Sequence, residues 1–173
     1  IQYYSYEEPI NPSEIVVVQP NIDPYQKFGS ISPAEQLENL ITLSKSVAKP
    51  NTEFFVWPET AISERGGINE EDFRQYPSYT RIVNFLGEYH NGNVLSGIES
   101  YRIYQDKQTN TARPFGASYV DSFNGSTLID GSSILQYYHK SKLVPGVEQL
   151  PFGDWMAFMT PLFDHFGGTT GGY

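Results

Sequence analysis

The stretch FFVWPETAI, residues 54–62, predicts a buried strand that ends in a polar turn. Its first four residues are all apolar, which is typical of a strand that is covered on both faces. Pro58 ends the strand because proline has no N–H to donate to a neighbouring strand. Glu59 follows directly, beyond the carboxyl end of the strand, where open α/β sheets bind their ligands. The stretch therefore predicts an α/β sheet with a carboxylate at its ligand-binding edge.

The segments around this stretch alternate between strand and helix patterns. Ser32-Pro33-Ala34-Glu35 predicts a helix start, because Ser32 can cap the helix, proline suits its first position and Glu35 completes a capping box. The order of elements favours a layered α/β sheet with antiparallel strands added in its second half. We expect strands at 15–18, 54–57, 93–100, 117–122 and 133–139, helices at 33–49 and 78–89, a loop at 101–114, and turns at 124–125 and 130–131.

The composition is that of a globular protein and excludes several classes of function. The chain has 173 residues, which suits one domain, and its net charge of −9 leaves no basic stripe for nucleic acid. Cysteine is absent, which excludes disulfides, thiolate metal sites and a cysteine nucleophile within the chain. The three histidines are far apart, so we expect no metal and no cofactor. No apolar run is long enough to cross a bilayer.

Four charged residues are candidates for chemistry, although each also has an ordinary interpretation. Glu59, beside Trp57, would be partly desolvated and so a stronger base, or else a surface acid in an ion pair. Lys140 and Lys142 would point the same way on an extended strand, and a lysine near a carboxylate can hold an oxyanion. The alternative for them is a solvated strand end. Glu148 could equally be an exposed loop acid.

Two stretches taken together resemble signature regions of the nitrilase, or carbon–nitrogen hydrolase, superfamily. They are FFVWPETAI, residues 54–62, and YHKSKLVPGVEQLPF, residues 138–152. More narrowly, they are similar to the apolipoprotein N-acyltransferase family, and VVVQPNI, residues 16–22, resembles its first strand and following loop. The resemblance implies an α/β fold of the nitrilase-like layered α-β-β-α sandwich type, incomplete in this chain. Residues 1–173 would then be a single domain, the N-terminal part of a catalytic domain.

The resemblance also implies roles for three of these four candidate residues, and Lys142 has none in the pattern. Glu59 matches the general base, Lys140 the lysine that stabilises the oxyanion, and Glu148 a second functional glutamate. We therefore expect Glu59 and Lys140 to lie close together at one edge of the sheet. The family's nucleophile is a cysteine that follows Glu148, and this chain contains none. We expect the nucleophile in polypeptide outside the chain and the fragment alone to be inactive; a cysteine-free pseudoenzyme is the alternative.

The function that the resemblance implies is transfer of an acyl chain from a phospholipid to the N-terminal amine of a lipoprotein, through a cysteine thioester. The partners would be the phospholipid acyl donor, the lipoprotein N-terminus and, through transmembrane segments outside the chain, the membrane. The complete protein would lie in a bacterial inner membrane with this domain on the periplasmic side. Two alternatives are a soluble nitrilase-type amidohydrolase of a small substrate and a non-catalytic binding domain of the same fold.

The stretch FGDWMAFMTPLFDHF, residues 152–166, is unusually apolar for a surface loop. We expect residues 152–173 to form a mobile lid and tail that admits lipid. A core helix followed by a turn is the alternative. The side chains predicted to face lipid are Trp155, Met156, Phe158, Met159 and Phe163.

Overall fold

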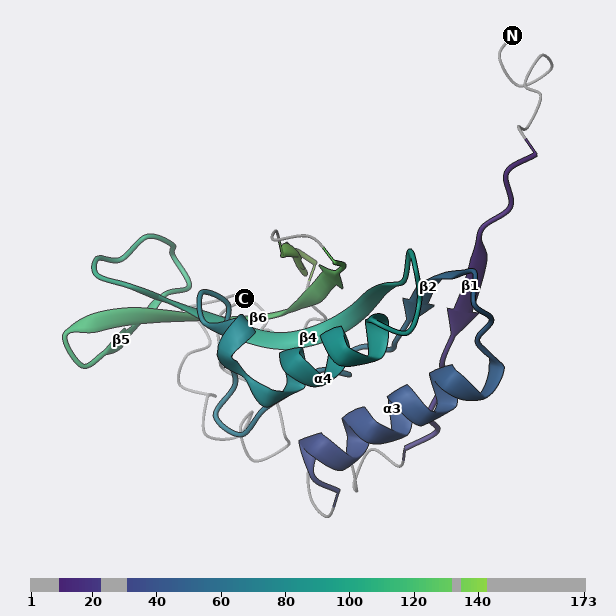
Figure 1. Cartoon of the computed structure of the whole chain (residues 1–173). Coiled ribbons are helices and arrows are strands. Elements are labelled where there is room, and N and C mark those ends of the chain that lie inside the picture. Colours follow the sequence, from purple (N-terminus) through teal and green to yellow (C-terminus); the bar gives the residue numbers. More distant parts are fainter. Residues whose placement is uncertain (1–9, 23–30, 132–134, 143–173) are drawn as a thin grey trace, which may run out of the picture.

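The computed structural model describes residues 10–22, 31–131 and 135–142, and within them a mixed sheet carries two helices (Figure 1). The main path of the sheet runs in the order β1-β2-β4-β6-β5, with β3 paired to β4 and β7 paired to β6. The strands are β1 (Glu14–Val17), β2 (Thr52–Val56), β3 (Ile68–Asn69), β4 (Asn93–Tyr104), β5 (Arg113–Phe115), β6 (Ser118–Ile129) and β7 (Gln136–His139). The helices are α3 (Pro33–Val47), α4 (Pro77–Leu86) and the short 3-10 helix η1 (Phe73–Gln75).

The strand directions confirm the predicted α/β class. β1, β2 and β4 are parallel, and the helices α3 and α4 lie in the connections between them. β6 runs antiparallel to β4, and both β5 and β7 run antiparallel to β6. The first half of the chain therefore builds a parallel sheet and the second half extends it with antiparallel strands, as the order of the elements predicts.

The two helices begin as the sequence predicts, but α4 ends earlier. Ser32 caps α3, since its hydroxyl accepts from the Glu35 N–H while the Glu35 carboxylate accepts from the Ser32 N–H. α4 ends at Leu86 rather than near Tyr89, which folds back in a turn. The Tyr89 ring still packs on Phe55 at a centroid distance of 4.8 Å. The Tyr89 ring therefore contributes to the core although the residue lies beyond the end of the helix.

The two faces of the parallel strands differ sharply in burial. Val16, Phe55 and Val94 point to the face that α3 and α4 cover, and they are buried in the core. Their neighbours Ile15 and Val17 are 53% and 74% exposed, although both are apolar. Successive side chains of a strand point to opposite faces, so these residues belong to the other side of the sheet. We call that side the open face, because Ile15 and Val17 are exposed on it.

The predicted turn at Asn124-Gly125 is wrong, because β6 runs straight through it. Gly125 pairs with Ile98 of β4 on one side and with His139 of β7 on the other. A Cβ at this position would lie 2.4 Å from the backbone oxygen of Tyr138. The glycine therefore permits the close approach of β7 rather than a turn.

The predicted loop at 101–114 is also only partly correct. β4 continues to Tyr104, and β5 forms at Arg113–Phe115, because both pair with β6 in a long antiparallel ribbon. A ribbon with exposed faces tolerates polar residues, so the polarity of this segment did not exclude strands.

Candidate active site

Glu59 stands on a tight turn that lies over Gly97 of β4. The N–H of Gly97 donates to Pro58 O at 3.1 Å, and the N–H of Ile62 donates to Gly97 O at 3.0 Å. A Cβ at Gly97 would lie 2.6 Å from Glu59 Cα and from Pro58 O, so only glycine fits. Thr60 has a φ of 48°, a left-handed conformation that is rare for a β-branched residue. The backbone around Glu59 is thus tightly constrained.

Trp57 ties this turn to the helix layer. The residue is 3% exposed, and its Nε1 donates to Ser44 Oγ of α3 at 3.0 Å. Its ring also stacks on Phe85 of α4 at a centroid distance of 6.2 Å. A buried tryptophan with its N–H satisfied is a rigid anchor. The strand end before Glu59 is therefore fixed from the covered face.

Lys140 approaches Glu59 from the other half of the chain. β7 ends at His139, and the N–H of Lys140 donates to Asn124 O at 2.9 Å, which continues the pairing with β6 by one residue. The Lys140 Nζ lies 3.4 Å from Glu59 Oε1. The Nδ2 of Asn124 donates to the same Glu59 oxygen at 2.5 Å. The predicted proximity of Glu59 and Lys140 is confirmed, and Asn124 is a third member of the cluster.

The exposure of the pair differs from the expectation for Glu59. The side chains of Glu59 and Lys140 are 61% and 32% exposed, so the partial desolvation expected for Glu59 is not present in the described residues. An exposed ion pair contributes only about 0–1 kcal/mol to stability. The contact is therefore informative about placement rather than about what holds the fold together.

An apolar hollow of about 360 Å³ adjoins this cluster on the open face. Glu59 and Lys140 are part of its lining, together with Val56, Leu95 and Tyr138. Leu95 and Tyr138 are 40% and 66% exposed. The arrangement combines a carboxylate, an ammonium and an apolar surface, which suits a substrate with an apolar part and a carbonyl that becomes an oxyanion.

Comparison with known proteins agrees with the resemblance in the sequence. No family model matches the chain. Over 151 residues, 86% of the chain, it is 26% identical to an apolipoprotein N-acyltransferase of Chlorobaculum tepidum. The predicted resemblance to apolipoprotein N-acyltransferase is confirmed. The matched region is 27% of that relative, so the chain spans about a quarter of its length.

Of the other predicted residues, some lie inside the described ranges and some lie outside them. Lys142 lies beyond the end of β7 and is exposed. Glu148 and the side chains predicted to face lipid, Trp155, Met156, Phe158, Met159 and Phe163, lie outside the described residues. Within the described ranges, no group of three or more acidic or histidine side chains could hold a metal ion. Neither described α-helix is long and apolar enough to cross a bilayer.

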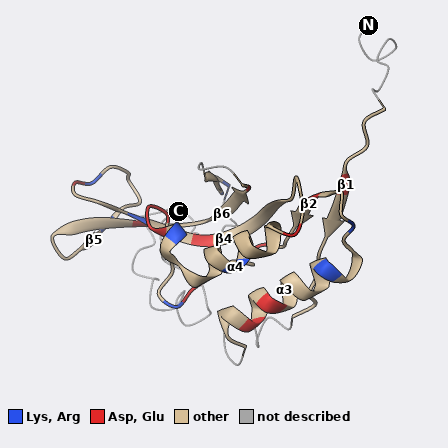
Figure 2. Cartoon of the chain, viewed as in Figure 1, with Lys and Arg blue, Asp and Glu red and all other residues tan. Residues whose placement is uncertain are grey.

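The charges of the described elements are mixed in sign (Figure 2). Lys and Arg residues are scattered singly among Asp and Glu rather than gathered along one element. The described elements therefore present no continuous stripe of positive charge that could bind a polyanionic ligand.

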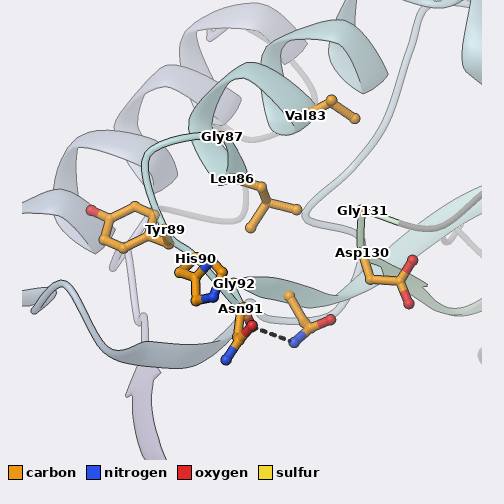
Figure 3. Close-up of a pocket in the computed structure, with 10 residues that line it drawn as sticks. Val83, Leu86, Gly87, Tyr89, His90, Asn91, Gly92, Asp130 and Gly131 are labelled. Atoms are coloured by element: carbon orange, nitrogen blue, oxygen red, sulfur yellow. Dashed lines mark hydrogen bonds between the residues drawn. The ribbon is translucent and has the colours of Figure 1, made fainter.

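A second hollow, of about 630 Å³, adjoins Asn93, the first residue of β4 (Figure 3). Its lining includes Leu86, Tyr89 and His90 after α4, and Asp130 after β6. Asn93, the first residue of β4, donates from Nδ2 to Asn91 O at 2.8 Å there. Parallel sheets bind ligands beyond the carboxyl ends of their strands, and this hollow adjoins the amino end of β4. A ligand site of the kind typical of such sheets is thus better placed at Glu59 and Lys140, beyond the carboxyl end of β2.

A buried cluster on the covered face was not predicted from the sequence. The Glu70 side chain is 2% exposed and accepts from Ser100 Oγ at 2.7 Å, from Arg102 Nε at 2.6 Å and from His139 Nε2 at 2.7 Å. Burial by itself lowers the pKa of Arg102, but the hydrogen bond and charge of Glu70 outweigh it and raise that pKa. Burial and the Glu70 charge both raise the pKa of Tyr137. Glu70 lies in the acidic run Glu70-Glu71-Asp72, and nothing in that run signals that one of its acids is buried.

Proposed function

We propose that this chain supplies the general base and the oxyanion-binding lysine of an acyltransferase that modifies lipoproteins. The observation that carries the proposal is the contact of Glu59 and Lys140, 3.4 Å apart across 81 residues of sequence. The fold brings these two oppositely charged residues together beside the apolar hollow. The similarity to an apolipoprotein N-acyltransferase over 86% of the chain supports the same assignment.

In the proposed mechanism, the nucleophile is a cysteine from polypeptide outside the chain. Glu59 takes the thiol proton, and the thiolate attacks the ester carbonyl of a phospholipid. Lys140 holds the oxyanion while the ester C–O bond breaks, and the proton on Glu59 passes to the departing lysophospholipid oxygen. The lipoprotein amine then attacks the thioester and loses a proton to Glu59. The amide forms and the thiolate, reprotonated by Glu59, returns to its starting state.

The substrates and location belong to this proposal as well. The apolar hollow beside Glu59 suits an acyl chain, and its open side suits a site that receives lipid. We assign the complete protein to a bacterial inner membrane, with this domain on the periplasmic side. Glu148 remains a predicted second functional glutamate, and residues 152–173 a predicted lid.

The same proposal includes the layered α-β-β-α sandwich. The open face supports it, because an apolar sheet face in a folded protein is normally covered by a further layer. Ile15, Val17 and Leu95 are the exposed residues that a second sheet would bury. The Glu59 and Lys140 cluster lies on this face, so the covering layer could bring the cysteine to it.

Formation of the thioester tests the function. In the full-length protein, Glu59→Gln keeps the size of the side chain but cannot take the thiol proton. We expect acyl-enzyme formation from phospholipid, followed by intact-protein mass spectrometry, to slow by about 10²- to 10⁴-fold. The matched control is Glu88→Gln, since Glu88 is an exposed acid paired with Lys45 near the helices. Thioester formation at the wild-type rate in Glu59→Gln would remove the role assigned to Glu59.

A further inference from the structure

Lys140 is held through its neighbour in the chain. His139 and Lys140 are consecutive at the end of β7, so their side chains point to opposite faces of the sheet. Lys140 reaches Glu59 on the open face, while His139 reaches Glu70 on the covered face. The strand end therefore has one fixed contact on each side.

The contact on the covered face is the more rigid of the two. His139 Nε2 lies 2.7 Å from Glu70 Oε1, and a carboxylate accepts, so this nitrogen is the donor. The imidazole also lies flat on the Phe123 ring, with centroids 3.8 Å apart and planes at 5°. The Glu70 side chain is 2% exposed, whereas that of Glu59 is 61% exposed. Charged hydrogen bonds away from water are stronger than exposed ones.

Glu70 is in turn fixed to β4 by three further contacts. Its N–H donates to Tyr101 O at 3.1 Å, and its carboxylate is held by Ser100 and Arg102 at 2.7 and 2.6 Å. β4 is also the strand whose Gly97 supports the Glu59 turn. One strand therefore positions both halves of the site, Glu59 from the open face and Lys140 through Glu70 and His139.

We propose that Glu70 is a positioning residue for the reaction: by binding His139 it fixes the end of β7 so that Lys140 Nζ stays beside Glu59. The inference rests on the proposed role of Lys140 as the oxyanion-binding group. Glu70 itself lies on the opposite side of the sheet and touches no substrate. A displacement of about 1 Å at a reacting group can cost on the order of 10²-fold in rate.

The test uses the full-length protein and two readouts. The first is acetylation of Lys140 relative to Lys142 by an amine-reactive reagent, measured by mass spectrometry, which needs no activity. The second is the rate of thioester formation in the wild-type and Lys140→Ala backgrounds. We expect Glu70→Gln to raise the labelling of Lys140 relative to Lys142. We also expect it to slow thioester formation by about 10- to 10²-fold in the wild-type background and to have no further effect in Lys140→Ala.

Two further variants separate positioning from a general loss of structure. Asp121→Asn is the matched control, since Asp121 is 2% exposed in β6 but accepts from Thr109 and Thr111 at 2.5 and 3.0 Å. We expect it to leave the labelling ratio of Lys140 to Lys142 unchanged. His139→Phe keeps a ring on Phe123 but removes the donor to Glu70, while Ser100 and Arg102 still hold that carboxylate. It should reproduce both effects of Glu70→Gln, including in a case where Glu70→Gln does not fold.

The outcomes distinguish this inference from the proposed function. A labelling ratio in Glu70→Gln and His139→Phe equal to that of Asp121→Asn would overturn the positioning role. An equal slowing by Glu70→Gln in both backgrounds would do the same, because the effect would not pass through Lys140. If Lys140→Ala instead leaves thioester formation intact, the proposed function fails, while the labelling readout still decides whether Glu70 holds Lys140 in place.

Discussion

Glu59 and Lys140 meet on the open face of the sheet, with Lys140 Nζ 3.4 Å from Glu59 Oε1, although they come from opposite halves of the chain. Glu59 lies in the turn after β2, and Lys140 is the first residue after β7. Neither side chain of this ion pair is buried enough for the contact to contribute much stability. The value of the pair is therefore its position, beside an apolar hollow and on a face where Val17 and Leu95 are exposed.

Substituting each of the two candidate lysines in turn should show that Lys140, and not Lys142, takes part in the reaction. In the full-length protein, we expect Lys140→Ala to lower kcat for acyl transfer by about 10²- to 10³-fold, the loss typical of one oxyanion donor. Lys142→Ala is the control, because Lys142 is exposed and lies beyond β7. Steady-state kinetics with a phospholipid donor and a peptide acceptor would check this. Equal losses in the two variants would contradict the assignment of Lys140.

Gly97 should be intolerant of any side chain. A Cβ there would lie 2.6 Å from the backbone of Pro58, Glu59 and Thr60, and backbone cannot move aside cheaply. We expect Gly97→Ala to lower the free energy of unfolding by about 1–3 kcal/mol and to displace the Glu59 turn. Gly131→Ala has open space around it and should stay within about 0.5 kcal/mol. Denaturant unfolding of both variants compares them, and similar stabilities would show that the turn is not packed on Gly97.

The open face should be covered in the complete protein. Val17 is 74% exposed on that face, and Val47 is 62% exposed at the end of α3. If a second layer packs on the sheet, Val17→Gln buries a polar group and should cost about 1–3 kcal/mol of stability. Val47→Gln should change stability by less than about 0.5 kcal/mol. Thermal unfolding of the full-length variants decides the matter, and a neutral Val17→Gln would mean that the face stays exposed.

The cap of α3 should give a defined pH dependence. Hydrogen bonds from the backbone and side chain of Ser32 lower the pKa of Glu35 below its ordinary value of 4.5. A depressed pKa means that the cap contributes stability above pH 4.5, and this contribution is lost as the pH falls through the folded-state pKa. We expect the stability difference between the wild type and Glu35→Gln to shrink on acidification from pH 7 to pH 3. A difference that stays constant over this range would show that the Glu35 charge does not stabilise the cap.

The sequence predicts the elements whose signals are local, and it fails where distant segments decide. The Ser32 cap and the apolar run before Pro58 are read from neighbouring residues, so α3 and β2 were predicted. Gly125 was misread because a glycine beside an asparagine signals a turn, whereas its actual cause is the close approach of Tyr138.

The candidate site shows the same division between local and distant signals. Glu59 and Lys140 were found through motifs, and their contact follows from where their strands end. Asn124 joins them only because β6 lies between β4 and β7. Glu70 was missed because its burial depends on Ser100, Arg102 and His139, which lie 30 or more residues away. No periodicity in the sequence brings those residues together.

The position of a cysteine sulfur relative to Glu59 and Lys140 tests the central claim most directly. An experimental structure of the full-length protein would measure it. We predict a cysteine Sγ within about 4 Å of a Glu59 carboxylate oxygen and on the open face, close enough for the carboxylate to take the thiol proton. An open face covered by polypeptide that places no cysteine near Glu59 would contradict the account.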